Sequence, residues 1–213
     1  MSSDVLVTTP AQRQTEPHAE AVSRNRRQQA TFRKVLAAAM ATLREKSYAD
    51  LTVRLVAARA KVAPATAYTY FSSKNHLIAE VYLDLVRQVP CVTDVNVPMP
   101  IRVTSSLRHL ALVVADEPEI GAACTAALLD GGADPAGRAV RDRIGAEIHR
   151  RITSAIGPGA DPGTVFALEM AFFGALVQAG SGTFTYHEIA DRLGYVVGLI
   201  LAGANEPSTG GSE

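Results

Sequence analysis

The stretch of this 213-residue chain that most constrains its fold runs from Leu51 to Leu77 and reads LTVRLVAARAKVAPATAYTYFSSKNHL. Thr52 suits the N-cap of a first short helix, because its hydroxyl can accept a hydrogen bond from a free amide of the first turn. Pro64 suits the first position of a second helix, where a backbone N–H would be unpaired anyway. The spacing therefore predicts two short helices joined by a tight turn at residues 61–63, which is a helix-turn-helix.

The second predicted helix, residues 64–70, is rich in hydroxyl groups that are poorly suited to burial. Its hydroxyl-bearing residues and the two lysines that flank it are Thr66, Tyr68, Thr69, Tyr70, Lys61 and Lys74. Such side chains suit the base edges of a DNA major groove and the phosphates beside it. We therefore expect this helix to be a recognition helix.

The same residues resemble the DNA-binding domain of the TetR family of bacterial transcriptional regulators. The matching motifs are Thr52-Val53, Thr66-Ala67-Tyr68-Thr69-Tyr70-Phe71, Ser73-Lys74 and Leu77, and the resemblance covers about residues 32–85. The chain has Lys61, Ala63 and Ala65 where the family usually has Gly, Ser and Gly. We expect Lys61 to adopt a conformation that a Cβ disfavours, and the missing serine cap at position 63 to cost about 1 kcal/mol.

Charge is distributed unevenly, although the net charge of the chain is zero. Residues 1–90 contain 13 Lys/Arg and 7 Asp/Glu, whereas residues 91–213 contain 8 Lys/Arg and 14 Asp/Glu, so the two parts carry +6 and −6. A basic part joined to an acidic part favours a module that binds a polyanion, attached to one that stays off it.

Several other classes of protein are disfavoured by composition. The two cysteines, Cys91 and Cys124, are far apart, which indicates neither a disulfide framework nor a zinc site, so we expect no metal and no cofactor. The first 20 residues lack the apolar core of a signal peptide. The longest apolar run, residues 165–179, is interrupted by Glu169 and is short for a membrane span. We therefore expect a cytoplasmic protein with no membrane partner.

Helical periodicity without strand-like alternation predicts an all-α fold. The predicted segments are a disordered tail over residues 1–22, a three-helix DNA-binding domain over 23–74, a connecting helix and linker over 75–100, a helical ligand-binding and dimerisation domain over 101–204, and a polar tail over 205–213. Besides the two helices of the motif, we expect helices near residues 28–45, 74–89, 101–116, 119–129, 134–156, 161–180 and 185–203.

The candidate DNA-binding residues are assigned different roles. We expect Thr66, Tyr68 and Thr69 to face the bases, with Ala63 and Ala65 near thymine methyl groups. The expected phosphate contacts are Thr52, Tyr70 and Lys74, joined by Arg26 and Arg27 of a basic segment that is either a groove-binding arm or a solvated helix start. Lys61 is assigned either to guanine or to the DNA backbone, Phe71 to the core, and His76 to solvent or to the vicinity of a phosphate.

Small residues recur at every fourth position in the last two predicted helices. The two sets are Ala167, Ala171, Ala175 and Ala179, and Ala190, Gly194, Gly198 and Ala202. Such ridges let helix backbones approach closely, so we expect a four-helix interface with a second copy of the chain, as the resemblance also implies. The alternative is that both ridges pack within one subunit.

The resemblance implies a ligand pocket in the C-terminal part. The candidate lining residues are Leu110, Val114, Leu128, Phe166, Met170, Phe173 and Val177. These residues line a cavity or simply fill a core. Because charges are scarce among them, a small apolar ligand such as a fatty acyl chain is favoured, with His109, His149, Gln178 and Glu169 as candidates for a polar end.

Together these features predict a ligand-responsive transcriptional regulator. We expect a homodimeric repressor that binds a palindromic double-stranded DNA operator and is released by the apolar ligand. A ligand-independent architectural DNA-binding protein is the nearer alternative, and an all-α enzyme the more distant one. No nucleophile elbow, HExxH motif or phosphate-binding glycine loop is present, and we therefore expect no catalytic residues.

Overall fold

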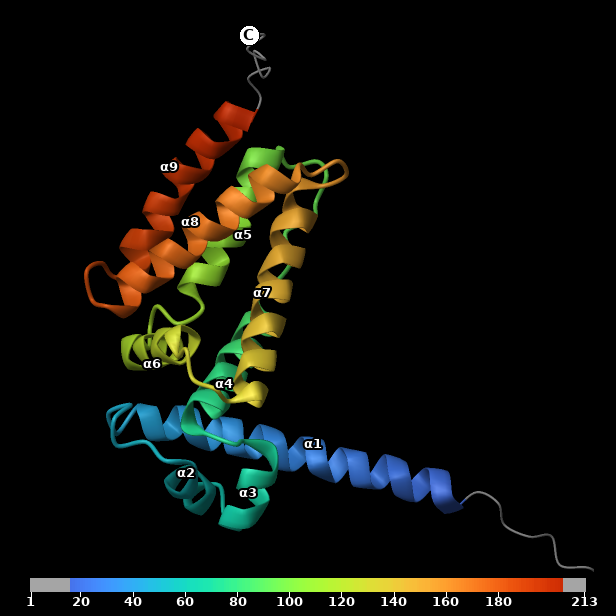
Figure 1. Cartoon of the computed structure of the whole chain (residues 1–213). Helices are drawn as coiled ribbons and strands as arrows, with labels where there is room; N and C mark the ends of the chain where they lie inside the picture. Colours follow the sequence, from blue (N-terminus) through green and yellow to red (C-terminus); the bar gives the residue numbers. More distant parts are fainter. Residues whose placement is uncertain (1–15, 205–213) are drawn as a thin grey trace, which may run out of the picture.

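Nine α-helices and no strand make up residues 16–204, the part of the chain that the computed structural model describes (Figure 1). They are α1 (Glu16–Leu43), α2 (Val53–Arg59), α3 (Pro64–Tyr70), α4 (Lys74–Gln88), α5 (Met99–Leu112), α6 (Pro118–Leu129), α7 (Pro135–Ile156), α8 (Pro162–Gly180) and α9 (Tyr186–Ala204). The all-α prediction is confirmed. Residues 1–15 of the tail expected over residues 1–22, and the whole tail expected over residues 205–213, lie outside the described residues.

The ends of α2 are set by the local sequence. Thr52 has extended backbone, and its Oγ1 accepts a hydrogen bond from the backbone N–H of Leu55 at 3.1 Å, which confirms the expected N-cap. At the other end the N–H of Lys61 binds the carbonyl of Ala58 and the N–H of Val62 binds that of Ala57, at 3.1 and 3.0 Å. These two bonds form a Schellman motif, whose position after the C-cap requires a left-handed backbone.

Lys61 occupies that left-handed position with φ +53°, as the sequence predicted. Among the described residues it is the only non-glycine residue with positive φ. The turn leads to Ala63, which is the N-cap of α3 and makes no side-chain capping bond, while Pro64 occupies the first helical position. The motif therefore folds in spite of two locally unfavourable residues.

The helix α1 holds the motif against the rest of the molecule. It begins at Glu16, so residues 16–22 are helical and the expected start near residue 28 is wrong. Phe32 of α1 stacks on Phe71 with ring centroids 5.1 Å apart, and Phe71 is fully buried as expected. In Figure 1 α2 and α3 lie on one side of α1, and the C-terminal helices lie on the other side.

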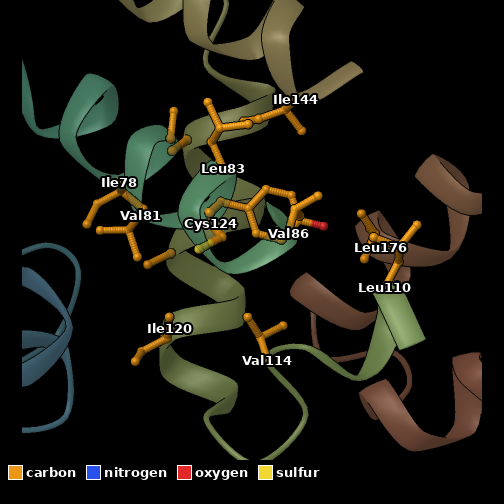
Figure 2. Packing of buried hydrophobic residues seen from close by; sticks show 14 of the residues in the cluster. Ile78, Val81, Leu83, Val86, Leu110, Val114, Ile120, Cys124, Ile144 and Leu176 are labelled. Carbon is orange, nitrogen blue, oxygen red and sulfur yellow. The ribbon is translucent and has the colours of Figure 1, made fainter. Parts of the chain in front are cut away.

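The helix α4 crosses from the motif into the C-terminal helices, and its first half is buried on every side. All eight residues from His76 to Leu83 are buried, whereas Asp84, Arg87 and Gln88 of its last turns are exposed. Figure 2 shows Ile78 and Val81 on one side of α4, Leu83 near Ile144 of α7, and Val86 on the side of Leu110 and Leu176. A helical segment buried all round belongs to the core, so α4 belongs to both parts of the molecule.

The five helices after α4 confirm the expected number and approximate positions. Helix α9 packs on α5 and α8, while α7 packs on α4 and α5, and α6 packs on α4 and α8. Two positions show how closely they approach: a Cβ added to Gly121 would lie 2.5 Å from the Tyr186 ring, and one added to Gly180 would lie 2.4 Å from Thr125 Oγ1.

By length and composition alone, α8 could cross a membrane, and 33% of its apolar window is buried. Core helices of water-soluble proteins meet the same criteria, so this is weak evidence for a membrane span. It does show that α8 carries apolar side chains on its outer face as well as its inner one.

The variant Lys61→Gly should raise the free energy of unfolding by about 1 kcal/mol. Relief of left-handed strain, about 1–3 kcal/mol, exceeds the additional backbone entropy that glycine loses on folding, about 0.5–1 kcal/mol. Urea unfolding monitored by circular dichroism measures the change. The control Lys61→Ala removes the same charge but keeps a Cβ, and equal effects of the two variants would contradict the strain argument.

Candidate DNA-binding site and effector domain

Nine of the candidate DNA-binding residues are exposed to solvent. They are Arg26, Arg27, Thr52, Lys61, Ala63, Ala65, Thr66, Tyr68 and Thr69. Six of these lie on α3 or in the turn before it, and Thr52 is the N-cap of α2, so the structure brings these seven together at one end of the molecule (Figure 1). Tyr68 exposes 52% of its surface, which is much for an aromatic residue of a folded protein and leaves its ring available to a partner.

The arginines of the basic segment lie on α1 and not on an extended arm. Arg26 and Arg27 are both exposed, ahead of Phe32 on the same helix. Of the two interpretations of this segment, the structure therefore shows the helical one. Their assignment to phosphates stays a prediction.

Two of the expected phosphate ligands are engaged within the protein. The Tyr70 ring is half-buried and meets Phe32 edge-on, with centroids 6.2 Å apart. Lys74 Nζ donates to the carbonyls of Tyr48 and Ala49 at 3.1 and 3.4 Å, and it lies 4.5 Å from the centroid of the Tyr48 ring. A phosphate would have to compete with these carbonyl oxygens for the ammonium group.

His76 is buried, so its expected exposure to solvent or phosphate is wrong. Its Nδ1 accepts from the backbone N–H of Ser72 at 3.2 Å, and its Nε2 lies 3.8 Å from Glu80 Oε1. The hydroxyl oxygen of Ser72 also lies 3.0 Å from Nδ1. Glu80 also accepts from Arg143 of α7. Burial raises the pKa of Glu80, but the hydrogen bonds from His76 and Arg143 outweigh it and leave the pKa below its ordinary value.

A second long-range ion pair joins the two parts of the molecule. Arg44, just after α1, donates through Nε and Nη2 to the two carboxylate oxygens of Glu117, the residue before α6. The hydrogen bond from Arg44 lowers the pKa of Glu117. The sequence predicted neither this pair nor Glu80–Arg143, because 73 and 63 positions separate the partners and no local pattern connects them.

The candidate ligand-lining residues are divided between the interior and the surface. Leu110 and Val114 are buried, and Leu128 and Phe173 are half-buried. In contrast, Phe166, Met170 and Val177 expose 62%, 53% and 39% of their surfaces. The structure therefore does not bring the seven together. The face of α8 that points inward carries Val165, Leu168, Phe172, Leu176 and Ala179.

The candidate polar end of the pocket is also on the surface in part. His149 of α7 and Glu169 of α8 form a pair with Nδ1 and Oε1 2.8 Å apart, and the His149 side chain is 59% exposed.

Each of the two small-residue ridges spans more than one face of its helix. Ala167, Ala171 and Ala175 are half-buried and Ala179 is buried; on α9, Ala190 is buried, Gly194 half-buried, and Gly198 and Ala202 exposed. Each step of four residues rotates by about 40° on a helix with 3.6 residues per turn, so a ridge of four spans two faces. The inner part packs within the subunit: a Cβ on Gly194 would lie 3.3 Å from Thr104 Cγ2 of α5.

The outer faces of α8 and α9 form an apolar surface with a groove between them. The groove has a volume of about 700 Å³, and its lining includes Met170, Gly174, Phe184, Leu193 and Tyr195. Large apolar residues of the same two helices expose more than half of their surface: Phe166, Met170, Tyr195 and Leu199. We call these four residues and the groove the α8–α9 face. An exposed apolar surface of this kind marks an interaction site.

Three weakly polar groups, one each from α4, α6 and α9, are buried near one another. The hydroxyl groups of Tyr82 and Tyr186 are buried without a hydrogen-bond partner among the described residues. Burial raises the pKa of both tyrosines and raises the pKa of the nearby Cys124 thiol to about 12. These groups therefore remain neutral at physiological pH.

Comparison with known proteins agrees with this geometry. Residues 35–81, which include the whole helix-turn-helix, match the family described as bacterial regulatory proteins, tetR family. The N-terminal part of the chain is therefore similar to the DNA-binding domain of that family, and a C-terminal helical domain follows it. The matched family and structures indicate no enzyme family.

Solved structures share the fold over most of the chain. A TetR transcriptional regulator from Rhodococcus sp. RHA1 is 21% identical, with a TM-score of 0.70 over 85% of this chain and 99% of the other. FadR of Thermus thermophilus, a TetR-family repressor in complex with lauroyl-CoA, is 18% identical, with a TM-score of 0.60 over 85% and 99%. FadR of Bacillus subtilis, in complex with stearoyl-CoA, is 14% identical, with a TM-score of 0.55 over 81% and 98%. At these identities the likeness shows the fold alone.

The variant Lys74→Ala tests whether the lysine reaches a phosphate. We expect it to weaken binding to all duplex sequences about equally, and to lower the slope of log affinity against log salt by about 1. Fluorescence anisotropy at several salt concentrations measures both quantities. An unchanged slope together with a lower melting temperature would instead assign the ammonium to the Tyr48 and Ala49 carbonyls alone.

Proposed function

We propose that this protein is a cytoplasmic homodimeric repressor, which binds a palindromic operator and is released by a ligand with an apolar acyl chain. The observation that carries the proposal is the position of α3, which is exposed and rich in hydroxyl groups. It belongs to the basic N-terminal part of the chain and lies at one end of the molecule, away from the acidic C-terminal helices (Figure 1). Paired recognition helices of a dimer meet two half-sites about one DNA turn apart. Base contacts are assigned to Thr66, Tyr68 and Thr69.

The α8–α9 face supports a dimer formed by these two helices. Its exposed residues Phe166, Met170, Tyr195 and Leu199 would leave water when a second copy covers them, and burying apolar surface stabilises association. The apolar composition of α8 on both its inner and outer faces has the same explanation. The exposed Gly198 and Ala202 allow close approach of the partner backbone, whereas Ala190 and Gly194 serve the contact with α5.

The ligand is assigned to the interior of the C-terminal helices, among α4, α5, α7 and α8. The side chains there are apolar, and they include Leu110, Val114, Phe172 and Leu176. The buried, unpaired hydroxyl of Tyr82 lies on α4, and an unmade hydrogen bond of this kind costs about 1–3 kcal/mol. A ligand acceptor would recover that cost. The acyl-CoA ligands of the two FadR proteins support an acyl chain as the apolar part.

The proposed release follows from population shift. An acyl chain that enters beside α4 favours an arrangement of the core in which the two recognition helices no longer match the half-sites. It can shift the equilibrium only by its difference in affinity for the two arrangements, typically about 1–3 kcal/mol.

Selection from a library of random DNA duplexes tests the DNA-binding part of this proposal. We expect the bound sequences to converge on an inverted repeat with half-site centres one helical turn apart. Addition of lauroyl-CoA should then weaken binding by roughly 5–150-fold, the usual range of coupling between sites, and native mass spectrometry should show a dimer carrying the ligand. Free coenzyme A is the matched control. Bound sequences without a repeat would favour the architectural alternative, and stronger binding with lauroyl-CoA would reverse the sign of regulation.

The variant Leu199→Asp should convert the dimer to a monomer. An unpaired carboxylate in the interface costs several kcal/mol, so we expect the dimer dissociation constant to rise by roughly a hundredfold or more. Analytical ultracentrifugation at micromolar concentration measures it. Leu129→Asp is the control, because Leu129 is 62% exposed but lies at the end of α6, off the α8–α9 face. A dimer that survives Leu199→Asp would place the interface elsewhere.

A further inference from the structure

The helices α4 and α7 run parallel and in register. Polar contacts join them near their beginnings, middles and ends: Ser73 to Asp134, Glu80 to Arg143, and the carbonyl of Val89 to Arg151. The partners are separated by 61, 63 and 62 positions, respectively. A nearly constant separation is what two parallel helices with the same rise per residue produce. In Figure 1 the two helices lie side by side.

The contact at the end of α4 is buried. The Arg151 side chain is 2% exposed, and it donates to the Val89 carbonyl at 2.5 Å and to Glu147 Oε1 at 3.0 Å. The last carbonyls of α4 have no partner within their own helix, so Arg151 satisfies a requirement that α4 cannot meet itself. Sliding α4 along α7 would break this contact and the two before it.

The contact at the beginning of both helices is made by one carboxylate. Asp134 is the N-cap of α7, and its Oδ1 accepts from the N–H of Ala136 at 3.1 Å. Its Oδ2 accepts from the hydroxyl groups of Ser72 and Ser73 at 2.6 and 2.9 Å. Ser73 in turn caps α4 by accepting from the N–H of His76 at 3.0 Å. The N-termini of α4 and α7 are therefore joined through Asp134.

The same contact reaches the recognition helix. Ser72 directly follows Phe71, the C-cap of α3, and its backbone N–H donates to His76. The segment after α3 is thus held to α4 through His76 and to α7 through Asp134. The hydrogen bonds from Ser72 and Ser73 lower the pKa of Asp134, so the carboxylate is ionised at neutral pH.

We propose that Asp134 is a positioning residue for operator binding, which transmits the position of α7 to the recognition helix through Ser72 and Ser73. The proposal rests on the DNA-binding function, and its role in ligand release rests on the repressor function proposed above. Buried residues of α7, among them Ile144 and Ile148, line the core of the C-terminal helices. A ligand that displaces α7 in this core therefore displaces the segment that ends α3.

The chain contains a matched control for Asp134. Asp161 is the N-cap of α8 and precedes Pro162, as Asp134 precedes Pro135. Its Oδ2 accepts from the N–H and the hydroxyl of Thr164 at 2.7 and 2.9 Å, which are contacts within its own helix. Asp161→Ala therefore removes a helix cap of the same kind, whereas Asp134→Ala removes the cap and the link to α3.

Two measurements on the full chain compare these variants. The first is hydrogen–deuterium exchange of the amides in residues 64–77, and the second is the affinity for a DNA duplex selected by the wild-type protein. Asp134→Ala removes the charged acceptor of the Ser72 and Ser73 hydrogen bonds. It should therefore accelerate amide exchange in residues 64–77 and weaken DNA binding, each by roughly tenfold or more. Asp161→Ala should change either quantity by no more than about twofold. Equal effects of the two variants would reduce Asp134 to a helix cap and overturn the proposal.

Ser72→Ala separates the link from the cap, because Ser72 is exposed and caps no helix. It should accelerate exchange in residues 64–77 while leaving α7 capped, and Ser72→Ala should add little to Asp134→Ala if both act through the same bond. Full additivity of the two substitutions would count against the link. If the wild-type protein selects no DNA, the repressor function fails, but the exchange comparison still decides the role of Asp134.

Discussion

The burial of the first half of α4 on every side is the constraint on which both parts of this molecule depend. The residues from His76 to Leu83 are all buried, and the apolar ones among them belong to one hydrophobic cluster that extends from Val35 of α1 to Leu201 of α9. No flexible connection is therefore interposed between the recognition helix and the C-terminal helices. Within residues 16–204, α3 is positioned by packing and by a few polar contacts at the N-terminal ends of α4, α6 and α7.

The features that could be predicted from the sequence are those encoded within a few residues. Thr52 and Pro64 set the starts of two helices, and Lys61 adopts the left-handed conformation expected for a position usually held by glycine. Periodicity and glycine-containing breaks gave the number of C-terminal helices. The start of α1 was placed too late. The residues before Gln28 are helical, but they are polar and show no apolar stripe that could have indicated a helix.

The features that could not be predicted depend on which side of a helix faces inward, or on partners far apart in sequence. Helix α8 is apolar nearly all round, so hydrophobicity did not distinguish Phe172, which faces the core, from Phe166 and Met170, which face outward. Asp134 was recognisable as a helix cap beside a proline, but its bonds to Ser72 and Ser73 cross more than 60 positions. His76 was assigned to solvent because it is polar. Inside the protein its ring nitrogens meet Ser72 and Glu80, which the sequence did not reveal. The DNA, ligand and dimer contacts themselves stay predictions.

The position of α4 also has a consequence for folding and for the exchange of parts between related proteins. Ile78 and Val81 lie on one side of this helix and Leu83 lies against Ile144 of α7, so neither part of the molecule has a complete core without the other (Figure 2). The two parts are therefore expected to unfold in one cooperative transition, and not as independent units. In a chimaera that joined this helix-turn-helix to a foreign effector domain, the side of α4 that packs on the C-terminal helices would have no complementary surface to pack against. Such a graft would have to take α4 and α7 together as its unit of exchange.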